Sequence, residues 1–235
     1  MQPQLWPQVL GALACNHAIL SCSMHPRSAW LGPNMTRLPD TGRPTVALTF
    51  DDGPDPEVTP RILDILDAHG AKASFFLIGR KVARHPALVR ELVRRGHAVE
   101  NHSQRHSLAF ACRGPWALWR EVTEAQRAIG DACGEVPRFF RAPMGLRNPM
   151  LDPVLATEGL SLVSWTRRGY DTMRRRPEPI LSRLTRGLAP GDILLLHDGS
   201  SALDADGSPV VLAVLPRLLD RISALGLRAA SLSEA

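Results

Sequence analysis

The 235-residue sequence predicts a single α/β domain in which about seven parallel strands form a closed or nearly closed barrel. From Arg43 onward, short apolar segments alternate with amphipathic helical segments, a pattern typical of parallel strands joined by helical crossovers. About seven such repeats fit the usual length of one barrel domain. With 44% hydrophobic and 22% charged residues, the composition excludes a disordered or fibrous protein.

The expected strands are short segments rich in apolar and β-branched residues. They lie at 45–50, 73–78, 97–101, in the segment ending at Arg141, and at 160–165, 193–197 and 227–232. The expected helices lie at about 59–69, 86–95, 115–132, 149–158, 179–186 and 210–225. Thr59 and Pro60 form an N-cap and N1 pair, and Gly70 and Gly96 are typical of helix ends.

Residues 1–39 are predicted to form a helical extension ahead of a main domain at 40–235. Apolar residues recur there at helical spacing and form a one-sided stripe. The stripe consists of Trp6, Val9, Leu10, Leu13, His17 and Leu20. We expect it to pack on the core of the chain, with His17 as a buried core histidine. The alternative is docking on a membrane surface or a partner.

We expect a cytoplasmic protein, with membrane association as the alternative. The first basic residue is Arg27, so the positively charged start of a secretion signal is missing. Four cysteines without metal-type spacing predict reduced, buried thiols. No apolar segment reaches membrane-spanning length, which excludes an integral membrane protein.

The net charge of +5 does not indicate a nucleic-acid partner. Arginine is spread along the whole chain instead of forming one basic patch. One tyrosine and six phenylalanines also leave few side chains for base stacking.

Polar side chains at the ends of the strands predict an active site at the carboxyl edge of the barrel. His102 and His106 form an i, i+4 pair, which on a helical turn directs two imidazoles to one face. Two histidines and one aspartate can bind a divalent cation and leave positions open for water and substrate. Zn²⁺ is the expected metal, and the same ligands accept Co²⁺ or Ni²⁺.

Asp51 and Asp52 follow the first strand and supply the remaining carboxylates. On an extended strand end they point in opposite directions, so one can bind the metal while the other faces the water. The alternative is that Asp-Asp-Gly-Pro is only a turn. His197 follows an apolar strand and is a candidate general acid, with a structural histidine as the alternative.

Four motifs resemble those of the NodB-type polysaccharide deacetylases, in the same order, between about residues 44 and 232. They are Thr49–Pro54 (TFDDGP), the pair His102 and His106, Arg141-Ala142-Pro143, and Leu196-His197. The resemblance implies a distorted (β/α) barrel with seven or eight strands. It also implies a hydrolase that removes N-acetyl groups from amino sugars of a polysaccharide or glycoconjugate.

The resemblance also implies a role for each matching residue. Asp52, His102 and His106 would bind the metal, Asp51 would be the general base, Arg141 would orient Asp51, and His197 would protonate the leaving amine. Asp171 matches an acid of a further motif and is expected to tether Arg141. Pro143, Met144 and Trp165 would contact the sugar, and Met144 would donate its backbone N–H to the oxyanion. Met144 replaces a usual aromatic, and Arg168 stands where an acid is usual.

The arginines after Trp165 predict a basic loop over the site, formed by Arg167, Arg168 and Arg174–Arg176. Such a loop favours an acidic or phosphorylated substrate, for example a lipid-linked or nucleotide-linked amino sugar, over a neutral polymer. The alternative is a solvated loop without a ligand. For the whole protein, the alternative to an enzyme is a catalytically idle carbohydrate-binding protein that keeps the fold.

Overall fold

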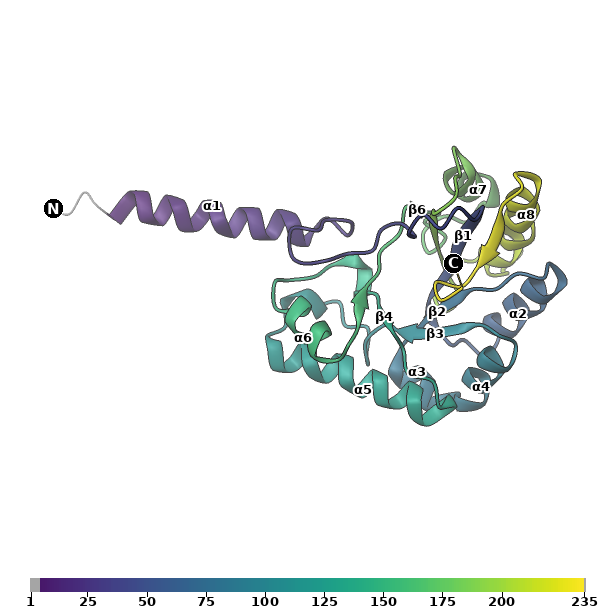
Figure 1. The fold of residues 1–235 in the computed structure, drawn as a ribbon, viewed down its shortest axis with the longest axis horizontal. Helices are drawn as coiled ribbons and strands as arrows, with labels where there is room; N and C mark the ends of the chain where they lie inside the picture. The colour runs from purple at the N-terminus through teal and green to yellow at the C-terminus, as the bar shows by residue number, and fades with distance from the viewer. Residues whose placement is uncertain (1–4, 235) are drawn as a thin grey trace.

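The computed structural model describes residues 5–234 and contains one curled, all-parallel sheet surrounded by helices (Figure 1). The strands are β1 (Thr45–Gly53), β2 (Ser74–Leu77), β3 (Ala98–Asn101), β4 (Phe139–Phe140), β5 (Ser161–Leu162), β6 (Arg167–Arg168), β7 (Ile193–His197) and β8 (Arg228–Ala230). Their order is β5-β4-β3-β2-β1-β7-β6, and β8 pairs with β1. The predicted distorted barrel of about seven parallel strands is confirmed. Strand β6 was not expected, because two arginines carry no strand pattern.

The helices are α1 (Leu5–Ser23), α2 (Val58–Ala68), α3 (Gly79–Arg84), α4 (Pro86–Arg94), α5 (Pro115–Cys133), α6 (Leu151–Thr157), α7 (Pro177–Thr185) and α8 (Val210–Ala224). Helix α3 was not expected. The expected N-cap at Thr59 is wrong, because α2 begins at Val58 and the Asp55 carboxylate accepts the N–H groups of Glu57 and Val58. The Thr59 hydroxyl instead donates to the buried carboxylate of Asp198 at 2.6 Å.

Strand β1 lies at the centre of the sheet, and all nine of its residues are buried. Val46, Leu48 and Phe50 belong to the core between the sheet and the outer helices, whereas Ala47 belongs to the cluster inside the barrel. Because side chains alternate along an extended strand, Thr49 and Asp51 share the interior side with Ala47. The carboxylate of Asp51 therefore enters the barrel at its carboxyl edge.

Helix α1 projects away from the barrel (Figure 1). The side chains of Trp6, Leu10 and Leu13 are 70%, 61% and 53% exposed, and His17 is exposed as well. The expectation that this stripe packs on the core is wrong, because α2, α4 and α8 already cover the outer apolar face of the sheet. The side chain of Leu20 lies outside the described residues.

The second half of the predicted extension is not helical and forms part of the barrel. Met35 bridges to Val163 just after β5, and the Leu38 N–H donates to the Gly191 carbonyl just before β7. Leu38 is only 8% exposed. We call residues 35–38 the seam segment. It thus joins the β5 edge of the sheet to the region of β7.

Three cysteines whose side chains the structure describes are free thiols. Cys15 and Cys112 are exposed and Cys133 is half-buried, so the expectation of buried thiols is wrong for the first two. Cys15 lies on the projecting helix, and Cys112 lies in a short surface turn at Phe110–Cys112. Within residues 5–234, no helix has both the length and the apolar character that crossing a membrane requires.

The contrast between α1 and the seam segment predicts different effects on stability. Removing residues 1–23 is expected to leave the thermal unfolding midpoint unchanged, because the exposed side chains of α1 contribute little burial. Leu38→Ala is expected to lower the free energy of unfolding by about 2–5 kcal/mol, the usual cost of a buried Leu→Ala cavity. Calorimetry on both variants checks this, and equal destabilisation by the two changes would contradict it.

Candidate active site

A bulge at the end of β1 brings two neighbouring carboxylates into one site. The register between β1 and β2 shifts between Asp51 and Gly53, and Asp52 has a φ of 74°. The Nε2 atom of His102 lies 3.9 Å from Asp51 Oδ2 and 3.4 Å from Asp52 Oδ1. The expectation that the two carboxylates point in opposite directions is wrong, because alternation requires an extended backbone and Asp52 is left-handed.

His102 and His106 lie in a loop after β3 and not on a helical turn as expected. Ser103 and His106 have φ values of 64° and 51°, which no helix allows. The Asn101 side chain accepts the Ser103 N–H, and the Ser103 hydroxyl accepts the His106 N–H. These bonds fold the loop so that the two imidazole rings lie 4.9 Å apart, and the pair shares one face despite the missing helix.

A backbone carbonyl fixes the orientation of the first histidine. The Nδ1 atom of His102 lies 2.7 Å from the Arg141 carbonyl oxygen. A carbonyl oxygen only accepts hydrogen bonds, so Nδ1 carries the proton and donates it. The lone pair of Nε2 is therefore directed at the carboxylates, the arrangement that metal-binding histidines use.

Asp52, His102 and His106 fit a divalent cation. Asp52 Oδ1 lies 3.4 Å from His102 Nε2 and 3.2 Å from His106 Nε2. Two ligand atoms that are each about 2.1 Å from a tetrahedral cation lie about 3.4 Å apart. The same Asp52 Oδ1 is buried, and apart from these two imidazole nitrogens it has no hydrogen-bond partner among the described residues. These residues form the one group of possible metal ligands found in residues 5–234.

The charges around this group couple metal binding to protonation. Burial alone raises the pKa of Asp52, but contact with His102 and the nearby histidines lower it well below its usual range. The pKa of His102 is raised, because Asp51 and Asp52 outweigh the opposing effect of burial. The pKa of His106 is lowered by burial and by His102. A bound cation would take the place of the proton that the raised pKa of His102 favours.

Arg141 is fully buried and holds Asp51 from inside the barrel. Its Nη1 atom donates to Asp51 Oδ1 at 2.6 Å and to Thr49 Oγ1 at 2.9 Å. Its other nitrogens donate to the carbonyls of Val163 and Ser164. Burial lowers the pKa of the guanidinium, and Asp51 opposes this effect. Asp51 Oδ1 is thereby fixed, while Oδ2 faces the histidines.

Asp171 holds His197 and not Arg141 as expected. Its carboxylate lies 2.9 Å from His197 Nδ1 and accepts the His197 N–H at 2.8 Å. The expectation fails because β6 pairs with β7 and therefore brings the following residues beside His197. Burial lowers the pKa of His197, but the Asp171 carboxylate outweighs burial and raises it above its ordinary value.

These groups meet in a cavity of about 290 Å³ at the carboxyl edge of the barrel. The cavity is lined by Asp51, Asp52, His102, His106, Met144, Gly145, Trp165, Arg168, Thr172, Leu195, His197 and Ser200. Of the three expected sugar contacts, Met144 and Trp165 line it. Pro143 is buried and is not part of the lining.

The predicted basic loop over the site is wrong for most of its members. Only Arg168 lines the cavity. Arg167 forms an ion pair with Asp192 at 2.5 Å, which directs its side chain away. Residues 174–176 are exposed and lie outside the lining.

Ser200 is a functional candidate that sequence reasoning missed. Its hydroxyl donates to Asp52 Oδ2, the carboxylate oxygen opposite the two histidines. It therefore orients the carboxylate whose Oδ1 faces His102 and His106. Its position shortly after His197 and Asp198 was the only signal in the sequence, and serine is common in turns that have no role in a site.

Comparison with known proteins identifies the family. Residues 39–163 match the family model described as polysaccharide deacetylase. The chain belongs to this family. It is 40% identical to a chitooligosaccharide deacetylase of Sinorhizobium fredii over 185 residues, which cover 76% of this chain and 86% of the relative. It is 32% identical to a peptidoglycan-N-acetylglucosamine deacetylase of Bacillus cereus over 207 residues, 87% and 91% of the two chains.

Solved structures of family 4 carbohydrate esterases share the fold. A family 4 carbohydrate esterase from Streptomyces lividans, in complex with acetate, matches with a TM-score of 0.71 and 33% identity over 79% of this chain and 91% of that one. A family 4 pseudoenzyme from Bacillus anthracis matches with a TM-score of 0.76 and 25% identity over 86% of this chain and 68% of that one. The resemblance inferred from the four motifs is confirmed.

Ser200→Ala is expected to weaken Zn²⁺ binding by about 10–100-fold, the usual effect of losing a partner that orients a metal ligand. Competition with a chromophoric chelator measures the affinity. Ser201→Ala is the matched control, because the Ser201 hydroxyl accepts the Val211 N–H and does not contact Asp52. An unchanged affinity in the Ser200 variant would rule out its orienting role.

Proposed function

We propose that the protein is a metal-dependent hydrolase that removes N-acetyl groups from the amino sugars of a glycan. The observation that carries this proposal is the position of Asp51 Oδ2, 3.9 Å from His102 Nε2, beside the group formed by Asp52, His102 and His106. A fixed carboxylate next to open metal positions is what the activation of a water molecule requires. Relatives named for chitooligosaccharide and peptidoglycan support N-acetylglucosamine units as the substrate.

The proposed cation is Zn²⁺, and the same donors also suit Co²⁺ or Ni²⁺. When bound, it would supply Lewis acidity toward the attacking water and the acetyl carbonyl. Asp51 accepts the proton of that water at Oδ2, because Arg141 already occupies Oδ1. The backbone N–H of Met144 is the proposed donor to the oxyanion, which is the former carbonyl oxygen of the acetyl group.

His197 is the proposed general acid. Because Asp171 accepts the Nδ1 proton, the opposite ring nitrogen, Nε2, is left for the cavity that His197 lines. Protonated Nε2 donates its proton to the sugar nitrogen as the C–N bond breaks. The products are acetate and a free amino sugar. The reaction thus needs two proton transfers. Asp51 accepts a proton from the water, and His197 donates a proton to the sugar nitrogen.

The alternative is a catalytically idle protein that binds a glycan. The similarity to a pseudoenzyme from Bacillus anthracis is the observation that favours this alternative. The side chains of this chain favour the enzyme. The proposed base contacts its arginine and His102, and the three metal ligands contact one another. The base, the metal ligands and the proposed acid line one cavity. An idle binder has no need for a buried carboxylate oxygen that faces two imidazole nitrogens at 3.2 and 3.4 Å.

Substitutions separate metal binding from proton transfer. His102→Ala and His106→Ala are expected to lose bound zinc and acetate release together. Asp51→Asn is expected to keep zinc while acetate release falls by about 10²–10⁴-fold, the usual contribution of a positioned base. Zinc is measured by mass spectrometry, and acetate release is measured on N-acetylchitohexaose and on peptidoglycan fragments. Zinc-loaded wild type that releases no acetate from either substrate supports the idle binder.

The proposed acid predicts a change in the pH profile. Asp171→Asn removes the charge that raises the pKa of His197, so the imidazole loses its proton at lower pH. The alkaline limb of kcat/KM is therefore expected to move to lower pH, while the acid limb stays in place. His197→Ala is expected to lower kcat by about 10²–10⁴-fold and to abolish that limb. An alkaline limb that does not move in the Asp171 variant would exclude His197 as its source.

A further inference from the structure

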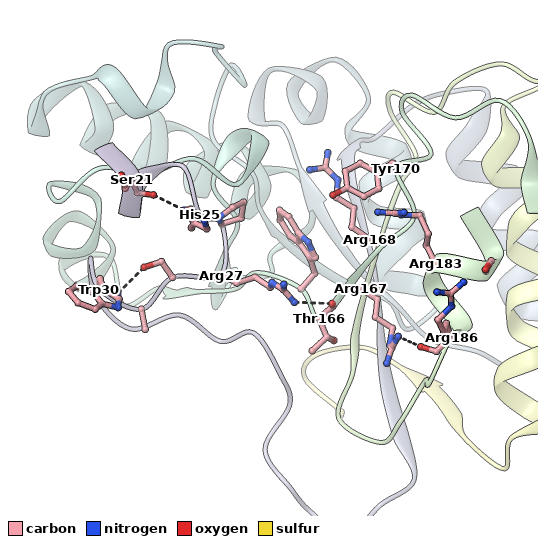
Figure 2. A pocket seen from close by; sticks show the side chains of 15 residues that line it. Ser21, His25, Arg27, Trp30, Thr166, Arg167, Arg168, Tyr170, Arg183 and Arg186 are labelled. Atoms are coloured by element: carbon pink, nitrogen blue, oxygen red, sulfur yellow. Dashed lines mark hydrogen bonds between the residues drawn. The ribbon is translucent and has the colours of Figure 1, made fainter. Parts of the chain in front are cut away.

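A second, larger cavity of about 1050 Å³ adjoins the active site (Figure 2). We call it the arginine groove. It lies between the segment after α1, the residues around β6, and α7. Its lining includes Pro26, Arg27, Trp165, Arg168, Tyr170 and Arg183. Trp165 and Arg168 line both cavities, so the arginine groove and the active site meet at these two side chains.

The lining of the arginine groove is strongly positively charged. It holds five arginines, namely Arg27, Arg167, Arg168, Arg183 and Arg186, and no acidic residue. Arg167 forms an ion pair with Asp192, which also pairs with Arg37. Within residues 5–234, no carboxylate forms an ion pair with the other four. The positive charge of the groove is therefore uncompensated by the protein.

Arg168 lies where the two cavities meet and has an incomplete set of hydrogen bonds. Its guanidinium carbon lies 5.3 Å from the Trp165 ring centre and 5.0 Å from the Tyr170 ring centre. Its Nε atom is buried without a hydrogen-bond partner among the described residues. The residue as a whole is half-buried, so the rest of the guanidinium reaches the groove. A buried N–H without an acceptor is costly, and an anion bound to this guanidinium would supply one.

A second guanidinium lies against the same tyrosine. The Arg183 guanidinium carbon lies 4.9 Å from the Tyr170 ring centre, and Figure 2 shows Arg168 and Arg183 both beside this ring. Contact with the aromatic ring holds each cation in place. A flat guanidinium fixed in this way is well suited to a carboxylate or a phosphate, which it can bind through two parallel hydrogen bonds.

The opposite wall of the groove is anchored to the barrel. The Pro26 carbonyl accepts hydrogen bonds from Ser164 Oγ at 2.6 Å and from Asn34 Nδ2 at 2.9 Å. Arg27 reaches across to the Thr166 carbonyl, as Figure 2 shows. Because these hydrogen bonds join the wall to the barrel within the chain itself, binding requires little ordering of this segment.

We infer that the arginine groove binds an oxyanion, a carboxylate or a phosphate, carried by the glycan on a unit next to the sugar in the active site. This inference rests on the proposed function and narrows its substrate to an acidic N-acetylated glycan. Arg168 and Arg183 contact the anion, and the shared Trp165 borders the path along which the glycan passes between the two cavities.

The test measures binding to the full-length, zinc-loaded chain with Asp51→Asn, so that the saccharide is not consumed. Three tetrasaccharides of equal length serve as probes in calorimetry. One is neutral N-acetylchitotetraose, one alternates N-acetylglucosamine with carboxylate-bearing N-acetylmuramic acid, and one is N-acetylchitotetraose with a phosphate monoester. At least one acidic probe is expected to bind about tenfold more tightly than the neutral one at low salt. This preference is expected to shrink at high salt.

A matched pair of variants shows which residues cause the preference for an acidic probe. Arg183→Gln is expected to remove most of this preference. Arg175→Gln makes the same change of charge at an exposed position outside both cavities and is expected to preserve it. A gain for the carboxylate probe alone, or for the phosphate probe alone, supports the inference and identifies the source of the anion. No preference for either acidic probe, or equal losses in the two variants, overturns it.

The failure of this inference can be told apart from failure of the proposed function. Acetate release by zinc-loaded wild type from any of the three tetrasaccharides tests the proposed function alone. A protein that releases acetate but shows no acidic preference retains the function and loses the inference. A protein that prefers an acidic probe, loses that preference in Arg183→Gln and never releases acetate loses the function and retains the anion site.

Discussion

The buried contact between Arg141 and Asp51 is the interaction on which the site depends. Both side chains lie inside the barrel, where an unpaired charge is strongly destabilising. The charge of Arg141 compensates the buried charge of Asp51, and Asp51 in turn compensates the buried charge of Arg141. The same arginine fixes His102, whose Nδ1 donates to the Arg141 backbone carbonyl. One residue thus orients both the proposed base and one metal ligand.

Around this pair, each proposed reacting group is held by a partner that leaves one atom free. Arg141 occupies one oxygen of Asp51, Ser200 one oxygen of Asp52, and Asp171 one nitrogen of His197. The remaining atoms face a common cavity. Such an arrangement fixes the geometry before a substrate arrives, which reduces the ordering that the reaction itself must achieve.

The regular parts of the fold and the edge that carries the site could be predicted from sequence. Burial of β1 on both faces produces the continuous apolar segment before Asp51, and parallel strands bring their carboxyl ends to one edge. What could not be predicted depends on irregular backbone. The left-handed conformation of Asp52 overrides strand alternation, and the loop of His102 and His106 reproduces the proximity of a helical pair without a helix. The partner of Asp171 depended on β6, which has no sequence signal of its own.

Strand β1 also has a consequence for how the chain acquires its structure. This strand comes early in the sequence, yet two of its neighbours, β7 and β8, come near the end. During synthesis its apolar side chains therefore emerge long before the segments that cover them. Pairings between such distant segments form slowly, and an uncovered strand is prone to aggregate in the meantime. The nascent chain is thus expected to depend on chaperones until its last strand has left the ribosome.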